Sequence, residues 1–234
     1  STQNILFLDI EAVKNTEPIK IKELGLVYGD DTLKTSSIAE AKAFIEACDP
    51  RYIAGHNFIE FDWKILKETL LFPVIEKRVI VDTLPISLLL FNEKTFHNLP
   101  KEYKSEDDFA NDPVEDSKLS RVLYEKCLKN FLSLPRHRQI IFYSLLYDTP
   151  LFRGFFETIQ NEAKLEVLNA EFLAKAIERL FDTVIHNPEK ILYAIQKHPV
   201  ELAYILALLT PDIEIKAHPP KILYDYPDIV SVQK

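Results

Sequence analysis

The first 132 residues alternate between short apolar runs and amphipathic stretches, which predicts a mixture of strands and helices. Apolar or β-branched runs predict strands at residues 5–8, 24–28, 32–35, 52–54 and 78–81. Helical spacing predicts helices at residues 38–48, 61–71, 84–91 and 114–132. Ser37 and Glu40 form a capping-box pattern at the start of the first helix. This order predicts an α/β fold in which helices cover a mixed sheet.

The pattern changes after residue 133. Apolar positions at helical spacing and bounded by prolines predict helices at residues 140–147, 170–181, 188–196 and 200–209. Residues 210–234 contain four prolines and are typical of a linker or docking tail. We therefore expect an α/β domain at residues 1–133, an all-α extension at 134–209 and a tail at 210–234.

Composition excludes several classes of protein. The 234 residues are 47% hydrophobic and 27% charged, which is the balance of a globular protein. A net charge of -8 excludes a wholly basic surface, although a local basic groove stays compatible with it. The four glycines cannot form GxGxxG or GxxxxGK[ST], the loops that hold dinucleotides or nucleoside triphosphates.

The two cysteines, Cys48 and Cys127, are too few for a disulfide framework or a four-thiolate zinc site. No run of about 20 apolar residues is present, and the polar start STQN does not have the pattern of a signal peptide. We therefore expect a cytoplasmic protein with no membrane partner.

Two acids follow the first predicted strand. Asp9 and Glu11 are at positions i and i+2, so an extended backbone places both on one face of the sheet. Two neighbouring carboxylates repel each other unless a cation neutralises them. The alternative interpretation is a strand that simply continues into a polar loop.

Two further acids, Asp62 and Asp116, lie in the first turns of predicted helices. Each could merely complement a helix dipole. Together with Asp9 and Glu11, however, they fall at strand ends or helix starts, where α/β sheets place their sites. Four converging carboxylates suit two Mg²⁺ or Mn²⁺ ions about 3.5–4 Å apart, the arrangement used for in-line phosphodiester displacement.

The segments FLDIE, GHN…FD and VDTL, followed by a helix with Asp116, resemble the DEDD (DnaQ-like) 3′–5′ exonuclease superfamily. The resemblance covers residues 4 to about 132. It implies a ribonuclease-H-like mixed sheet and release of nucleoside 5′-monophosphates. It also implies that Asp9, Glu11, Asp62 and Asp116 are the metal ligands, and that Asn57 lies near the site without binding metal.

The sequence departs from this family at the general base. In the family's histidine branch, HxAxxDA, the histidine deprotonates the attacking water, and this chain has Asn111 there. An amide cannot act as a base near neutral pH. The tyrosine branch would need a tyrosine at position 112, which is Asp112. His97 is the nearest candidate replacement, and its alternative is an ordinary loop histidine. Loss of a general base costs roughly 10²–10⁴-fold in rate, so we expect slow activity.

Candidate substrate contacts flank the fourth acid. Lys118 and Arg121 are placed to meet a substrate backbone, or else are ordinary surface residues. Further along, five aromatic residues could stack on single-stranded bases, although their near-helical spacing is more typical of a core. These residues are Tyr143, Tyr147, Phe152, Phe155 and Phe156.

A narrower resemblance extends over the whole chain. The pattern GHN…D, VDTL and Asn111…Asp116-Ser117, with FYSLLYD…FRGFF and HPPKILYDYPDIV, is similar to the N-terminal exonuclease-type region of some bacterial RecQ-type DNA helicases. This resemblance implies a helicase motor as a partner within a longer chain.

Three hypotheses follow. The first is a metal-dependent 3′–5′ exonuclease-like domain acting on DNA, with single-stranded 3′ ends as the favoured substrate. The second is a catalytically weak or silent module that binds nucleic acid or a partner. The third is an exonuclease for short RNA, which a preference for ribo-oligonucleotides would distinguish from the first, since no residue in the sequence reports on a contact to the 2′-hydroxyl.

Overall fold

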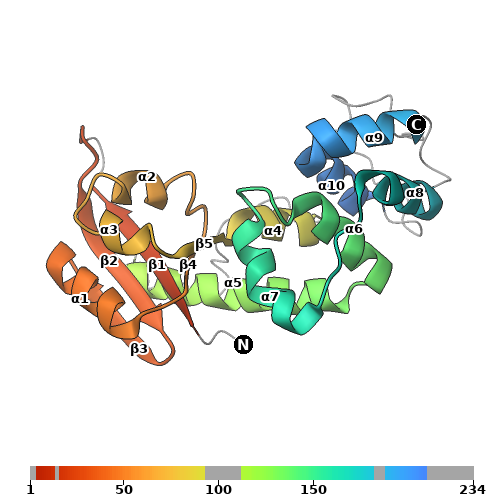
Figure 1. The fold of residues 1–234 in the computed structure, drawn as a ribbon. Coiled ribbons are helices and arrows are strands. Elements are labelled where there is room, and N and C mark those ends of the chain that lie inside the picture. Colours follow the sequence, from red (N-terminus) through yellow and green to blue (C-terminus); the bar gives the residue numbers. More distant parts are fainter. Residues whose placement is uncertain (1–3, 14–15, 93–111, 182–187, 210–234) are drawn as a thin grey trace. The chain divides into compact units, whose positions relative to one another are not determined.

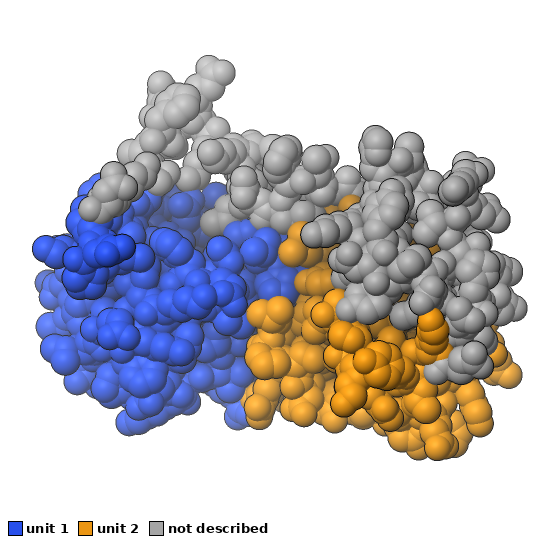
Figure 2. Space-filling view, turned by 90° about the horizontal axis from the view of Figure 1, so that it is seen from above, with its two compact units in different colours: residues 1–87, 94–129 blue, residues 88–93, 130–234 orange. Residues whose placement is uncertain are grey.

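A computed structural model describes residues 4–13, 16–92, 112–181 and 188–209 of the chain (Figure 1). The chain divides into two units, coloured separately in Figure 2: residues 1–87 with 94–129, and residues 88–93 with 130–234. The division falls inside two helices, α4 (Thr83–Leu90) and α5 (Pro113–Ser133). The tail at 210–234 lies outside the described residues.

The first unit is built on a five-stranded sheet. Its strands are β1 (Ile5–Ala12), β2 (Ile21–Tyr28), β3 (Asp31–Thr35), β4 (Tyr52–Gly55) and β5 (Val79–Asp82). They lie in the order β3-β2-β1-β4-β5, so β1 is central. β2 pairs antiparallel with both β1 and β3, whereas β4 runs parallel to β1 and β5. The predicted α/β fold with a mixed sheet is confirmed.

Helices cover both faces of this sheet. Leu6, Leu8 and Ile10 of β1 belong to a buried cluster with side chains of α1 (Ile38–Cys48), α2 (Asp62–Leu66) and α3 (Phe72–Ile75). Phe7 lies on the opposite face because side chains alternate along a strand. Its ring packs edge-on against Tyr124 of α5, with centroids 5.9 Å apart. Asp9 and Glu11 are two and four residues after Phe7 on the same strand, so they face α5 as well.

Several predicted elements have different bounds, and two of the differences bear on the acids. β1 continues to Ala12 because β2 keeps pairing with it as far as Ile21, so Asp9 and Glu11 lie within the strand rather than after it. The predicted helix at 61–71 is two short helices, α2 and α3. Thr69 separates them, because its hydroxyl donates to the Leu66 carbonyl and accepts the Leu71 amide.

The second unit is helical in its described part, which confirms the predicted helical extension. Its helices are α6 (Arg136–Leu146), α7 (Arg153–Ala163), α8 (Ala170–Leu180), α9 (Pro188–Lys197) and α10 (Pro199–Leu208). Spacing did not delimit α7, which contains the paired Phe155 and Phe156. Both rings pack against Phe131, with centroids 6.1 and 5.3 Å away. Among the helices of the described ranges, none combines the length and the apolar character needed to cross a bilayer.

Candidate functional site

Asp9 and Glu11 share the α5 face of β1. They alternate with Ile10, which is buried in the cluster on the opposite face. Asp9 pairs across the sheet with Gly25, and Glu11 pairs with Glu23. Like charges directly opposite each other on a sheet are unfavourable. The predicted shared face therefore brings negative charge together at one end of the central strand.

Asp62 contacts β1 at the edge opposite β2, the edge along which β4 pairs. β4 pairs with β1 only as far as Phe7 and Ala54, so beyond that point β1 has an edge that β4 does not cover. The amide of Ile10, the residue between the two acids, donates to Asp62 Oδ1 at 3.1 Å. This contact brings the helix start that carries Asp62 to the segment that carries Asp9 and Glu11.

The Asp62 side chain is almost fully buried, with the residue 3% exposed. Burial raises the pKa of Asp62 to about 8. The backbone amides of Asp62 and Ile10 work in the opposite direction by stabilising the charged form, and the nearby Asp82 adds to the rise. In the metal-free protein, the Asp62 carboxyl is therefore largely protonated at neutral pH.

Asp116 reaches this end of the sheet through a close contact between α5 and Gly25. A Cβ at position 25 would lie 2.1–2.3 Å from backbone atoms of Pro113 and Val114, so only glycine allows the approach. Ser117 Oγ donates to the Gly25 carbonyl at 2.9 Å. Because Gly25 lies opposite Asp9, the turn that contains Asp116 lies beside Asp9. The predicted position of Asp116 in the first turn of a helix is confirmed.

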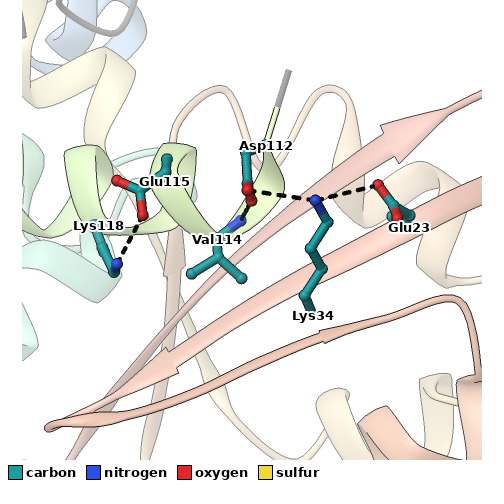
Figure 3. A network of polar contacts seen from close by, with 6 residues as sticks. All are labelled: Glu23, Lys34, Asp112, Val114, Glu115 and Lys118. Atoms are coloured by element: carbon teal, nitrogen blue, oxygen red, sulfur yellow. Dashed lines mark hydrogen bonds and ion pairs between the residues drawn. The ribbon is translucent and has the colours of Figure 1, made fainter. Parts of the chain in front are cut away.

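Asp112 and Lys34 hold the start of α5 (Figure 3). Asp112 Oδ1 accepts the Val114 amide at 2.9 Å, and its Oδ2 accepts Lys34 Nζ at 3.3 Å. Lys34 Nζ also lies 3.7 Å from Glu23 Oε2. Partial burial would raise the pKa of Asp112, but the Val114 amide and Lys34 outweigh it and the pKa is lowered. The residue at the family's tyrosine position is thus an ionised helix cap, which is a poor proton acceptor near neutral pH.

Asp82, the acid of the VDTL segment, is a further residue of this region, and the sequence alone assigned it no role. Its carboxylate accepts the amides of Asn57, Ile59 and Leu84 at 2.9–3.0 Å. Burial raises its pKa in spite of these three hydrogen bonds. Asp82 therefore shapes the loop that leads to Asp62. The signal in the sequence was an acid between a buried strand and a helix.

Gly25 was also missed, although it was one of only four glycines in the chain. A glycine inside a strand often marks a site where another backbone approaches closely. Here the approaching backbone is the first turn of α5, as the contact with Pro113 shows.

The predicted substrate contacts have partners of their own. Lys118 is exposed and pairs with Glu115 at 2.7 Å. Arg121 Nη1 donates to the Gly29 carbonyl at 2.7 Å, in the turn between β2 and β3. Asn57 is exposed and has a left-handed backbone, with φ of 58°. Asn111, at the expected position of the general base, and His97, its candidate replacement, lie outside the described residues.

The four predicted metal ligands do not form a ready cation site. Within the described ranges, no three His, Cys, Asp or Glu side chains are grouped so that they could hold a metal ion. The carboxylates suit Mg²⁺ or Mn²⁺ by their chemistry, but their arrangement does not fit one as it stands. The two-ion site stays a prediction.

Comparisons of the chain with protein-family models, with curated proteins and with solved structures gave no match.

Proposed function

We propose that the first unit is a DEDD-like 3′–5′ exonuclease domain of ribonuclease-H-like fold that acts on DNA. One observation carries this proposal: contacts at Ile10 and Gly25 draw Asp62 and α5 to the β1 segment that bears Asp9 and Glu11. Acids from three segments that are far apart in sequence, β1, α2 and α5, thus come from elements that meet at one end of the central strand. A purely structural sheet has no need of such a meeting, because bringing carboxyl groups together and burying one of them destabilises the fold.

Mg²⁺ or Mn²⁺, when bound, would neutralise this charge and polarise a phosphodiester. In the described residues, however, no three of the carboxylates are grouped so that they could hold such an ion. The roles of the chain's own residues are positional. Asp82 holds the loop before Asp62, Gly25 admits the start of α5, and Asp112 caps that helix with its charge balanced by Lys34.

The favoured substrate is a single-stranded DNA 3′ end, with short RNA as the alternative. Lys118 and Arg121 lie on α5 after Asp116 and supply positive charge on the helix that carries the fourth acid. Both already have partners, so a phosphate would have to compete with Glu115 and with the Gly29 carbonyl. A helicase motor within a longer chain is the partner that we propose from the narrower resemblance.

The proposal is tested with 5′-labelled single-stranded DNA and matched RNA in Mg²⁺ or Mn²⁺. We expect a slow ladder that shortens from the 3′ end of DNA and is lost in Asp9→Asn and Asp116→Asn. Glu68→Gln is the matched control, since Glu68 is an exposed acid elsewhere in the first unit. A ladder that persists in both aspartate variants would refute the assignment of the acids. A stronger ladder on RNA than on DNA would show that RNA is the preferred substrate.

A second candidate is a silent module that binds nucleic acid or a partner domain. It is favoured by the absence of a three-acid metal group among the described residues and by Asn111 at the expected base position. This candidate predicts that fluorescence anisotropy detects binding of single-stranded DNA, while no product forms with either metal. Hydrolysis that depends on Asp9 would exclude it.

A further inference from the structure

The second unit contains a hollow lined by α6, α7 and the turn between them. Its volume is about 230 Å³. Three aromatic residues line it, Tyr143, Tyr147 and Phe156, together with four polar ones, Asp148, Arg153, Glu157 and Gln160. This volume is below the roughly 300–1,000 Å³ of pockets for drug-sized ligands. The hollow therefore suits one small head group.

The aromatic residues form an angled wall. The ring of Tyr143 lies 5.4 Å from those of both Tyr147 and Phe156, inclined by 39° to the first and 71° to the second. Tyr143 and Phe156 are buried, whereas Tyr147 is 38% exposed. Of the five aromatic residues considered as stacking platforms, Tyr147 alone is exposed in this way, and the other four belong to the core. Ring faces are electronegative, and a wall of several inclined rings is the usual recognition surface for an ammonium group.

The charged side chains of the lining are two carboxylates and one guanidinium, so the lining is negatively charged overall. Gln160 Nε2 donates to the Leu165 carbonyl at 2.8 Å, which fixes the orientation of its amide. Gln160 Oε1 is buried and has no hydrogen-bond partner among the described residues. Asp148 and Glu157 add two carboxylates, and the exposed Arg153 is the single cation of the lining. A buried acceptor without a donor is destabilising, and a ligand that donates a hydrogen bond would satisfy it.

We propose that this hollow binds an organic ammonium group. Such a group brings positive charge to the ring faces and carboxylates, and an N–H form can also donate to Gln160 Oε1. A phosphate would be attracted by Arg153 alone and repelled by both Asp148 and Glu157. The proposed site lies wholly in the second unit, so it is independent of the acids of the first unit and of their proposed function.

The test measures binding of choline to the whole chain by saturation-transfer NMR. The reference ligand is the uncharged analogue in which a tert-butyl group replaces trimethylammonium. We expect choline to bind about 5-fold or more tightly than this analogue. Tyr147→Leu and Glu157→Gln should each weaken choline binding by about 5- to 10-fold, whereas Glu166→Gln, a change to an exposed acid outside the hollow, should not. Circular dichroism establishes that each variant is folded.

Equal binding of the two ligands, or unchanged affinity in both Tyr147→Leu and Glu157→Gln, would overturn the proposal. Two further arms distinguish the sources of the ammonium group. Tighter binding of a peptide that carries trimethyl-lysine would assign the site to a protein partner. Equal or tighter binding of free choline or spermidine would assign it to a small amine. If none of these amines binds, the proposal is wrong.

Discussion

The two units bury different kinds of side chain. The sheet unit buries two carboxyl groups, Asp62 and Asp82, whose pKa values burial raises. In the described part of the helical unit, the buried polar side chain is Gln139, an uncharged amide that donates to the Leu132 and Leu134 carbonyls. Burying a carboxyl group opposes folding unless its charge is balanced. The buried carboxyl groups therefore destabilise the first unit at one end of its sheet, which is common at functional sites. The helical unit is stabilised mainly by apolar packing.

The substitution with the largest expected effect on stability tests whether the two units unfold separately. Phe155 is 1% exposed and contacts Phe131 and Phe156, so Phe155→Ala should destabilise the helical unit by about 3–5 kcal/mol. Urea unfolding is followed by circular dichroism for the helices. Fluorescence of Trp63, the only tryptophan in the chain, follows the sheet unit, where it packs against Phe58 and Phe72.

We expect the circular dichroism transition to shift and the Trp63 transition to stay. Phe172→Ala is the control, since Phe172 is 61% exposed and its loss should cost less than about 0.5 kcal/mol. Equal shifts of both signals would show that the units unfold as one.

A substitution at Gly25 tests the contact that brings α5 to the sheet. Gly25→Ala should destabilise the sheet unit by about 3 kcal/mol, because the new Cβ would overlap the backbone of Pro113. The Trp63 transition in urea measures this loss. Gly29→Ala is the matched control: nothing lies within 4 Å of its Cβ, and its positive φ of 59° should cost about 1 kcal/mol. Equal losses in the two variants would mean that α5 does not lie against Gly25.

The buried Asp62 predicts how stability depends on pH in the metal-free protein. The pKa of Asp62 is about 8 when folded and about 3.9 when unfolded. The unfolded chain therefore loses this proton first, and the free energy of unfolding falls as pH rises from about 4 to about 8. Between pH 6 and 8 we expect a fall on the order of 2 kcal/mol, measured by urea unfolding in EDTA.

Asp62→Asn should flatten this dependence in part, because Asp82 has a raised pKa and remains. Glu68→Gln should leave it as in the parent chain, since Glu68 is exposed. An equal slope in the parent chain and in Asp62→Asn would contradict the burial of this carboxyl.

The smallest effect concerns the cap of α5. Asp112→Ala should cost about 1 kcal/mol, whereas Asp112→Asn should cost less because asparagine also caps helices. Lys34→Gln should cost less than about 0.5 kcal/mol, since both members of this ion pair are about 40% exposed. Because the pKa of Asp112 is lowered, its contribution is present above about pH 4 and is lost as pH falls further. Urea unfolding at pH 3 and 6 checks this, and an unchanged pH dependence in Asp112→Asn would rule it out.

Local patterns predicted much of the fold. The helix after Ser37 has the predicted bounds, because its cap and spacing are properties of neighbouring residues. β1 was predicted too short, since its continuation depends on pairing with β2, a partner distant in sequence. The break at Thr69 depends on a side-chain hydrogen bond within a segment whose apolar spacing is helical throughout.

For the candidate site, the sequence indicated where the four acids fall along the chain but not how they are arranged. The sequence placed Asp9, Glu11, Asp62 and Asp116 at strand and helix positions near one end of the sheet. It could not indicate that Asp62 binds the Ile10 amide, or that Gly25 admits α5, because these contacts join elements distant in sequence. The role of Asp82 required the positions of three amides that no motif contains.

The close approach at Gly25 also has a consequence for the search for relatives. A side chain at this position would displace α5, so any diverged chain with the same arrangement needs glycine opposite the first acid and a small donor such as Ser117 after the last. The order and spacing of Asp9, Gly25 and Asp116-Ser117 form a sequence signature. It combines the glycine that the close contact with α5 requires with the two acids of the candidate site. A profile that weights Gly25 as heavily as the acids should distinguish chains that keep this geometry from chains that merely share acidic residues.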